Sequence, residues 1–195
     1  MSLEPGRTHR YLTEEPLYSF GFGLSSGAAL ANYSSASVTP NKVSAAAPPH
    51  NLTVRVDISA LRGGDRADLR QQNASLYEDF LPAEQVEIVQ LYAGWQAPSP
   101  ESREAGEASV PLHQLVSFRR VQLGTSSSPQ TVEFEVPLHK LSLMLPTREM
   151  GLMQGKWKFW IGGTSPRTPS GLLRGAEEAS VGAPQPPLPV EFEVV

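Results

Sequence analysis

Apolar and polar residues alternate along several stretches of the chain, which is the pattern of half-buried β-strands. In the stretch 52–58, Leu52 and Val54 would face one side of a sheet, while Thr53 and Arg55 would face the other. This period of two predicts seven short strands in all. The stretches that show it clearly are 52–58, 131–136, 156–161 and 190–194, and those that show it more weakly are 32–39, 86–95 and 115–123.

Segments rich in Pro, Gly and Ser separate these stretches, and the combination predicts an all-β, immunoglobulin-like sandwich of two sheets. Two of the connections are long, 62–84 and 163–187. Within the first, residues 74–80 have the apolar spacing of one or two helical turns. The stretch 86–92 breaks the simple alternation, which predicts either a bulge near Ile88 or a central strand covered on both faces.

The alternation also predicts the core. Trp157 and Phe159 should point inward between the two sheets, together with Val132, Phe134 and Phe192. The charged residues between them should face solvent and serve solubility and strand register, because exposed ion pairs stabilise a fold very little. These acidic residues are Glu133, Glu135, Glu191 and Glu193, with Lys156 and Lys158 as their expected partners across the sheet.

Composition limits the class of protein. The chain has 195 residues, 39% of them hydrophobic, which suits one domain with long loops. Its formal net charge of -4 comes without a run of Lys or Arg, which argues against nucleic-acid binding. No apolar stretch is long enough to span a membrane, and the first residues lack the apolar core of a signal peptide. The absence of cysteine excludes disulfides and thiolate metal sites.

Three asparagines lie in acceptor triplets for N-glycosylation. Such sites favour a parent protein of the secretory pathway or the cell exterior, although the chain itself gives no signal for its localisation. The candidate glycosylation sites are Asn32, Asn51 and Asn73.

Large apolar residues crowd residues 6–25, a segment that we call the aromatic ribbon. Pro16, Gly21 and Gly23 disfavour a regular helix or a central strand there. An apolar segment of this kind must pack against something, either the flank of its own domain or a neighbouring domain. Its large apolar residues are Tyr11, Leu17, Tyr18, Phe20, Phe22 and Leu24.

Several of these stretches together resemble one known domain. Residues 6–11 (GRTHRY) and 16–25 (PLYSFGFGLS) resemble the junction that precedes the C-terminal fibronectin type III-like domain of family 3 glycoside hydrolases. Residues 89–92 (VQLY), 111–123 (PLHQLVSFRRVQL) and 155–162 (GKWKFWIG) are similar to strands of that domain, in the same order. The GRT opening resembles the β-xylosidase/arabinofuranosidase branch of the family more than the β-glucosidase branch.

The resemblance implies a fibronectin type III-like sandwich over residues 28–195 and a junction segment over 1–27 that packs on upstream catalytic domains. It implies that the chain alone is not an enzyme, because the family's catalytic aspartate and glutamate lie upstream. The chain would stabilise a parent hydrolase, β-xylosidase-like, that degrades plant cell-wall polysaccharides or oligosaccharides. Met1 would then mark a truncated gene model, a fragment or an excised piece. The implied docking residues are Arg7, Tyr11, Leu17, Tyr18, Phe20 and Phe22.

The chain departs from the family pattern in several places. Ser19 stands where the family usually has proline. Ser26 and Gly27 replace a Tyr-Thr pair, which removes an aromatic anchor where the first strand begins. The loops 62–84 and 163–187 are insertions, and structureless loops of such length usually have a function of their own or are disordered.

No group of residues indicates catalysis. Retaining glycoside hydrolysis needs two converging carboxyl groups, whereas the pairs at 14–15 and 177–178 are expected to be solvated loop charges. The sequence has neither a Ser-centred nucleophile elbow nor a phosphate-binding loop. We therefore expect no cofactor and no metal. The four histidines lack metal-ligand spacing: His9, His50, His113 and His139.

Two other functions are compatible with the sequence. A free carbohydrate- or surface-binding sandwich could stack a sugar ring on Trp160, with Tyr92 and Trp95 ending another strand nearby. The same aromatics could instead pack under loops or against the catalytic domains. The second rival is a cell-surface adhesion module, since this architecture serves many roles. The expected partners are therefore upstream catalytic domains and, in the rival reading, carbohydrate, but neither nucleic acid nor a membrane.

Overall fold

The computed structural model describes residues 8–25, 31–60, 85–97, 110–123, 128–145, 147–166 and 185–195. Several predictions lie outside these ranges and receive no structural account. They are the docking residue Arg7, the pair at 26–27, the loop 62–84 with its helical turns at 74–80, Asn73, the acidic pair at 177–178, and residues 167–184 of the second long loop.

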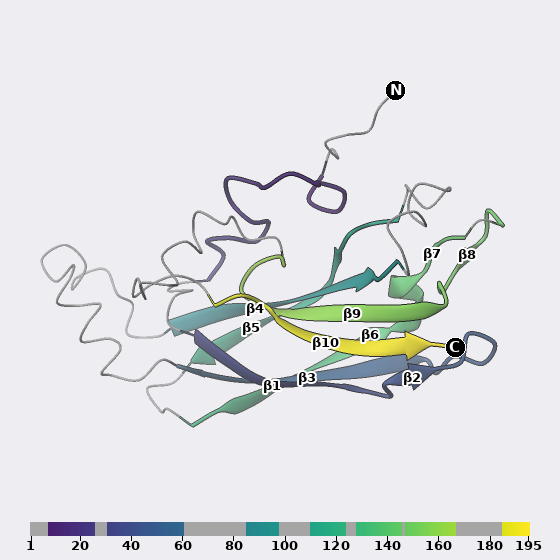
Figure 1. Ribbon diagram of the computed structural model, residues 1–195. Coiled ribbons are helices and arrows are strands. Elements are labelled where there is room, and N and C mark those ends of the chain that lie inside the picture. Colours follow the sequence, from purple (N-terminus) through teal and green to yellow (C-terminus); the bar gives the residue numbers. More distant parts are fainter. Residues whose placement is uncertain are drawn as a thin grey trace, which may run out of the picture.

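The described residues form a sandwich of two sheets, in which most neighbouring strands are antiparallel (Figure 1). One sheet has the order β2-β10-β9-β4-β5 and the other the order β1-β3-β6. A separate hairpin, β7–β8, and the short 3-10 helix η2 lie between β6 and β9 in sequence. The elements are β1 (Ala31–Thr39), β2 (Lys42–Val43), β3 (Asn51–Ala60), β4 (Gln85–Trp95), β5 (Gln114–Leu123), β6 (Gln130–Pro137), η2 (Leu138–Leu141), β7 (Leu143–Met144), β8 (Met150–Gly151), β9 (Gly155–Gly162) and β10 (Leu188–Val194).

The seven predicted strands all form, as β1, β3, β4, β5, β6, β9 and β10. The all-β sandwich of two sheets expected from the sequence is therefore confirmed. The elements that the alternation did not predict are the two-residue strands β2, β7 and β8 and the helix η2. Segments of these lengths are too short to show a period of two.

The core lies between the two sheets and contains the predicted residues. Trp157 and Phe159 are fully buried, and Phe192 from the adjacent strand β10 stacks on both, with ring centroids 6.0 and 5.0 Å away. The indole N–H of Trp157 donates to the carbonyl of Met153 at 2.8 Å, so the buried ring leaves no polar atom unsatisfied. Phe134 from the opposite sheet is also fully buried.

Strand β4 lies between β9 and β5, with the core on one face and the ribbon on the other, and this cover on both faces explains its irregular pattern. The side chains of residues 89–95 are all buried, with Gly94 having none. The prediction of a strand covered on both faces is therefore confirmed. The bulge predicted near Ile88 is wrong: the pairing of β4 with β5 shifts between Leu91 and Tyr92 instead. The extra residue at that point is Val116 on β5.

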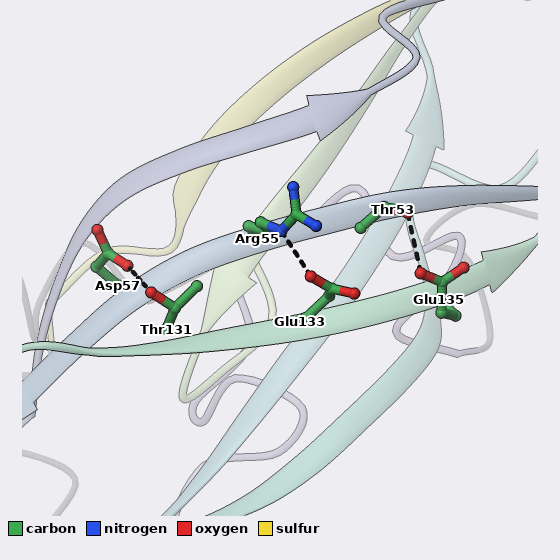
Figure 2. Close-up of polar contacts among 6 residues, drawn as sticks. All are labelled: Thr53, Arg55, Asp57, Thr131, Glu133 and Glu135. Carbon is green, nitrogen blue, oxygen red and sulfur yellow. Dashed lines mark hydrogen bonds and ion pairs between the residues drawn. The ribbon is translucent and has the colours of Figure 1, made fainter.

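The outward acidic residues of β6 face solvent as predicted, but their predicted lysine partners are wrong. Strand β6 pairs with β3 and not with the lysine-bearing strand β9. Figure 2 shows the resulting ladder of polar contacts across β3 and β6. Its rungs are Arg55 Nε to Glu133 Oε2 at 2.6 Å, Thr53 Oγ1 to Glu135 Oε1 at 2.9 Å and Thr131 Oγ1 to Asp57 Oδ1 at 2.7 Å.

The acidic residues of β10 follow the prediction in one of two cases. Lys158 on β9 pairs with Glu191 at 2.9 Å, as expected. Lys156 lies opposite Glu193 in the register of the two strands, but Glu193 forms its ion pair with Lys42 of β2, at 3.1 Å. The sequence could not predict this partner because β2 is a two-residue strand.

The core geometry generates the first prediction. Replacing Trp157 by alanine should lower the free energy of unfolding by about 3–5 kcal/mol, because a fully buried ring leaves a cavity. Replacing Glu133 by glutamine should cost less than about 0.5 kcal/mol, because its pair with Arg55 is exposed to solvent. Thermal or denaturant unfolding of both variants measures the difference, and the reverse order would mean that the register of β6 and β9 is wrong by one residue.

Candidate docking site

The aromatic ribbon lies on the outer side of the five-stranded sheet, away from β1 and β3 (Figure 1). Its backbone is held there through carbonyl groups. The N–H of Leu112 donates to the carbonyl of Arg10 at 2.7 Å, and the N–H of Ser165 donates to that of Phe20 at 2.9 Å. The ribbon's own described amides bond locally: those of Tyr11 and Leu12 donate to the carbonyl of Thr8, and that of Phe22 donates to the carbonyl of Ser19.

Two polar side chains of β4 form the floor beneath the ribbon. The side-chain amide of Gln90 donates to the carbonyl of Gly21 at 3.1 Å and to that of Gly163 at 2.5 Å. The hydroxyl of Tyr92 donates to Gln90 Oε1 at 2.5 Å and lies 3.3 Å from the carbonyl of Phe20. Both side chains are buried, so these bonds satisfy groups that water does not reach. Burial also raises the pKa of Tyr92, which therefore keeps its proton as a donor.

Gly21 fits this contact because it has no side chain. Its φ is +83°, a backbone region that favours glycine, and a Cβ placed on it would lie 2.0 Å from Gln90 Oε1. Gly23 has a similar φ of +78°, but nothing lies within 4 Å of a Cβ placed there. The two glycines therefore share the same backbone strain on substitution and differ only in the clash with Gln90.

The apolar side chains of the ribbon point away from this floor. Leu17 is 89% exposed, Tyr18 67% and Leu24 61%, while Phe20 and Phe22 are a little under half exposed. The ring of Tyr18 packs beside that of Phe22, with centroids 5.3 Å apart. We call these exposed apolar side chains of the ribbon the ribbon patch. Such a patch on a monomer is typical of an interaction surface.

The structure places the predicted docking residues in two groups. Leu17, Tyr18, Phe20 and Phe22 all belong to the exposed patch. Tyr11 is half-buried, with the guanidinium of Arg10 5.6 Å from its ring centroid. The sequence left open whether the ribbon packs on its own domain or on a neighbour. In the structure its backbone bonds to the sandwich, while the side chains of Leu17 and Tyr18 are exposed.

A histidine-aromatic cluster supports one edge of the ribbon. The ring of His9 stacks on Phe20, with centroids 3.9 Å apart, and lies 5.9 Å from the ring of His113. Burial and the nearby charge of Arg10 lower the pKa of His9. Within the described residues, no group of three or more His, Cys, Asp or Glu side chains is arranged to hold a metal ion.

The aromatic platform considered for sugar stacking does not form. Tyr92 is fully buried beneath the ribbon, and Trp95 is buried in the core with its indole N–H donating to the carbonyl of Gln154 at 2.9 Å. Trp160 is half-buried and meets the ring of His113 edge-on. Of the two alternatives that the sequence left open, the structure favours packing under other segments, because the ribbon lies over Tyr92 and Trp95 faces the core.

Among the residues that the structure describes, one carboxyl group is buried between the two sheets. Glu87 of β4 is 1% exposed, and its Oε1 accepts a hydrogen bond of 2.5 Å from the hydroxyl of Tyr33 on β1. Burial raises the pKa of Glu87 above its ordinary value of 4.5, against the hydrogen bonds from Tyr33 and Ser25 that lower it. Burial and the charge of Glu87 likewise raise the pKa of Tyr33. This single carboxyl faces a phenol and not a second acid, which retaining glycoside hydrolysis would need.

Two of the candidate glycosylation sites fall within the described residues. Asn32 at the start of β1 and Asn51 at the start of β3 are both exposed. Their side chains are therefore accessible to modification, and they lie on the three-stranded sheet rather than beneath the ribbon.

Comparison with a family model gives a match over residues 87–165 to the fibronectin type III-like domain. The match spans β4 to β9 and includes Gln90 and Tyr92. The chain carries a fibronectin type III-like domain. The resemblance of residues 89–92, 111–123 and 155–162 to strands of that domain is therefore confirmed.

Solved structures contain the same fold within larger chains. A β-glucosidase from Listeria innocua matches 99% of this chain at 18% identity and a TM-score of 0.54. A β-D-glucoside glucohydrolase from Trichoderma reesei matches 92% at 22% identity and 0.54, and β-glucosidase 3B from Thermotoga neapolitana matches 92% at 17% identity and 0.53. The fibronectin type III-like chain spans only about a fifth of these proteins, at 20%, 20% and 17% of their lengths.

Sequence reasoning missed the floor of the site. Gln90 belongs to the strand motif at 89–92, but the motif does not indicate that this side chain anchors the ribbon. The available signal was an uncharged polar residue between Val89 and Leu91, in the strand predicted to be covered on both faces. A polar group in such a position needs hydrogen-bond partners, and a glycine-rich segment elsewhere can supply carbonyls at close range.

The two glycines generate a matched prediction. Gly21→Ala should release the ribbon from Gln90, and trypsin should then cleave after Arg10 much faster than in the unchanged protein. Gly23→Ala carries the same backbone strain without the clash, and its cleavage rate should stay closer to that of the unchanged protein. Equal cleavage rates for the two variants would show that the contact between Gly21 and Gln90 does not hold the ribbon.

The raised pKa of Glu87 generates a pH prediction. A group with a higher pKa in the folded than in the unfolded state favours folding as it takes up its proton. Thermal stability should therefore gain from Glu87 as the pH falls from neutral toward its ordinary pKa of 4.5, and lose that gain as the pH rises through the raised value. Melting curves of the Glu87→Gln variant should lack this gain. A variant with the same pH dependence as the unchanged protein would contradict the assignment.

Proposed function

We propose that the chain is a non-catalytic accessory domain of a family 3 glycoside hydrolase and that it stabilises the catalytic domains of its parent. The observation that carries this proposal is the division of the ribbon. Its backbone carbonyls bond to the sandwich, while Leu17, Tyr18 and Phe22 present an apolar patch to the outside. A patch held in place in this way is preorganised to bury itself against a second surface.

The preceding catalytic domains are the proposed occupant of this patch. The junction lies at the N-terminal end of the domain, so the patch lies close in sequence to whatever precedes the sandwich. Support comes from the solved β-glucosidases, in which a chain of this fold forms about a fifth of a larger protein. The parent's sugar specificity is proposed on the GRT motif at 6–8 alone, as β-xylosidase or arabinofuranosidase. We further propose a secreted or extracellular parent, on the accessible Asn32 and Asn51.

The domain alone is proposed to be inactive on glycosides. Purified protein should not hydrolyse aryl xylosides, arabinosides or glucosides, since the buried carboxyl of Glu87 faces Tyr33 rather than a second acid. Activity that is lost on mutation of one carboxylate of this chain would contradict the proposal.

The docking role is tested in the longer protein that contains the catalytic domains. Replacing Phe20 and Phe22 together by alanine should lower its melting temperature, because apolar area would be lost from the seam between domains. Its preference among sugars should not change, since neither residue is proposed to touch substrate.

The matched control replaces Met144 and Met150, which are similarly exposed but lie on the β7–β8 hairpin. If the methionine pair lowers the melting temperature of the longer protein as much as the phenylalanine pair, the patch has no special role. If the phenylalanine pair lowers the stability of the isolated domain equally, the loss is internal to the sandwich and the docking role is contradicted.

A further inference from the structure

The apolar surface of the ribbon continues onto strand β5, the edge strand of the five-stranded sheet. Phe118 on this strand is 63% exposed, and Leu115 is also exposed. In the register of β4 and β5, Phe118 lies opposite Gln90 and Leu115 lies opposite Tyr92. Side chains of directly paired residues share one face of a sheet. Phe118 and Leu115 are therefore on the outer face, the face that carries the ribbon.

The two apolar regions are adjacent because one residue connects them. Gln90, the neighbour of Phe118 across the strands, holds the carbonyl of Gly21. Gly21 lies between Phe20 and Phe22 in the ribbon, so the ribbon and Phe118 both lie next to Gln90 on the outer face of the sheet. The exposed apolar surface is thus formed by two segments about one hundred residues apart in sequence, and the fold brings them together.

An arginine side chain lies beside this apolar surface on β5. Arg120 lies opposite Ile88, whose N–H donates to the hydroxyl of Ser25 at the end of the ribbon, so Arg120 shares the outer face with Phe118. It is exposed, and no described acidic residue forms an ion pair with it. On the opposite side of the molecule, by contrast, Arg55 is paired with Glu133.

We propose that Phe118 and Arg120 are part of the docking surface and that a preceding catalytic domain covers them, with an apolar pocket for Phe118 and a carboxylate for Arg120. This inference rests on the proposed function and adds the chemistry of the partner surface. An aromatic anchor beside an arginine is a typical composition for the centre of a protein interface. The charge fixes the orientation in which the ribbon and β5 meet the partner.

Hydroxyl-radical footprinting of the longer protein and of the isolated chain tests the inference. Tyr18 reports cover of the ribbon, and Phe118 reports cover of β5. Both side chains should be modified several-fold more slowly in the longer protein than in the isolated chain. Slower modification of Tyr18 with Phe118 unchanged would overturn the inference while leaving the proposed function intact. No change at either residue would overturn both.

The isolated chain also distinguishes the occupant. If modification of Phe118 in the isolated chain slows as the protein concentration rises, a second copy covers the surface, and the assignment to a catalytic domain is overturned. Modification that is independent of concentration supports the assignment.

A charge reversal with a matched control tests the carboxylate. Arg120→Glu should restore fast modification of Phe118 in the longer protein, because two negative charges would then meet at the seam. Arg119→Glu makes the same charge change one residue away, but Arg119 lies opposite the core residue Val89 and thus on the other face of the strand. It should leave Phe118 shielded. Equal effects of the two substitutions would overturn the proposed carboxylate partner.

Discussion

The buried side-chain amide of Gln90 is the contact on which the arrangement of this domain depends. It lies in the centre of the five-stranded sheet, where an amide without partners would cost about 1–3 kcal/mol. Its hydrogen bonds go to the backbone of the ribbon at Gly21, to the loop after β9 at Gly163 and to the hydroxyl of Tyr92. This one side chain thus joins β4 to the ribbon and to the loop after β9, which are both distant from it in sequence. Satisfying this group places the ribbon on the outer face of the sheet.

The two outer faces of the sandwich differ as a consequence. On the three-stranded sheet, polar and charged side chains pair with each other across β3 and β6 and remain in contact with water (Figure 2). On the five-stranded sheet, the ribbon covers the polar side chains and turns its own apolar residues outward. Of these two outer faces, as far as the structure describes them, the second is the one with large exposed apolar side chains. A domain with one polar, solvent-exposed face and one apolar face is suited to pack against a larger assembly through the apolar face alone.

The strands could be predicted from the sequence because the period of two is a local property. Leu52 to Ile58 and Trp157 to Ile161 follow it closely, and each forms a strand with those residues in the core. Partners across the sheet could not be predicted, because alternation gives the face of a residue and not its neighbouring strand. Glu133 was correctly expected at the surface, yet its partner is Arg55 of β3, on the sheet opposite to the expected lysines.

The candidate site could be predicted only in part. The exposed residues of the ribbon could be predicted because Tyr18, Phe20 and Phe22 lie in a segment whose prolines and glycines disfavour a regular strand or helix. Its anchor could not, since the role of Gln90 depends on a contact between residues 69 positions apart. The same limit left open whether the aromatics of β4 and β9 form an open platform or pack under other segments. Tyr92 and Trp95 end a strand in sequence, but they lie on opposite faces of it: the ribbon lies over Tyr92, and Trp95 faces the core.

Hydrogen exchange at the amide of Ser165, measured by NMR on the isolated chain, tests the central claim most directly. This amide belongs to the sandwich and donates to the carbonyl of Phe20, so it reports whether the ribbon stays on its own domain when nothing else covers it. The amide should be protected in the unchanged protein and should lose that protection in the Gln90→Leu variant, while amides in the centre of β3 stay protected in both. Fast exchange of Ser165 in the unchanged protein would show that the sandwich does not hold the ribbon, and would contradict the account.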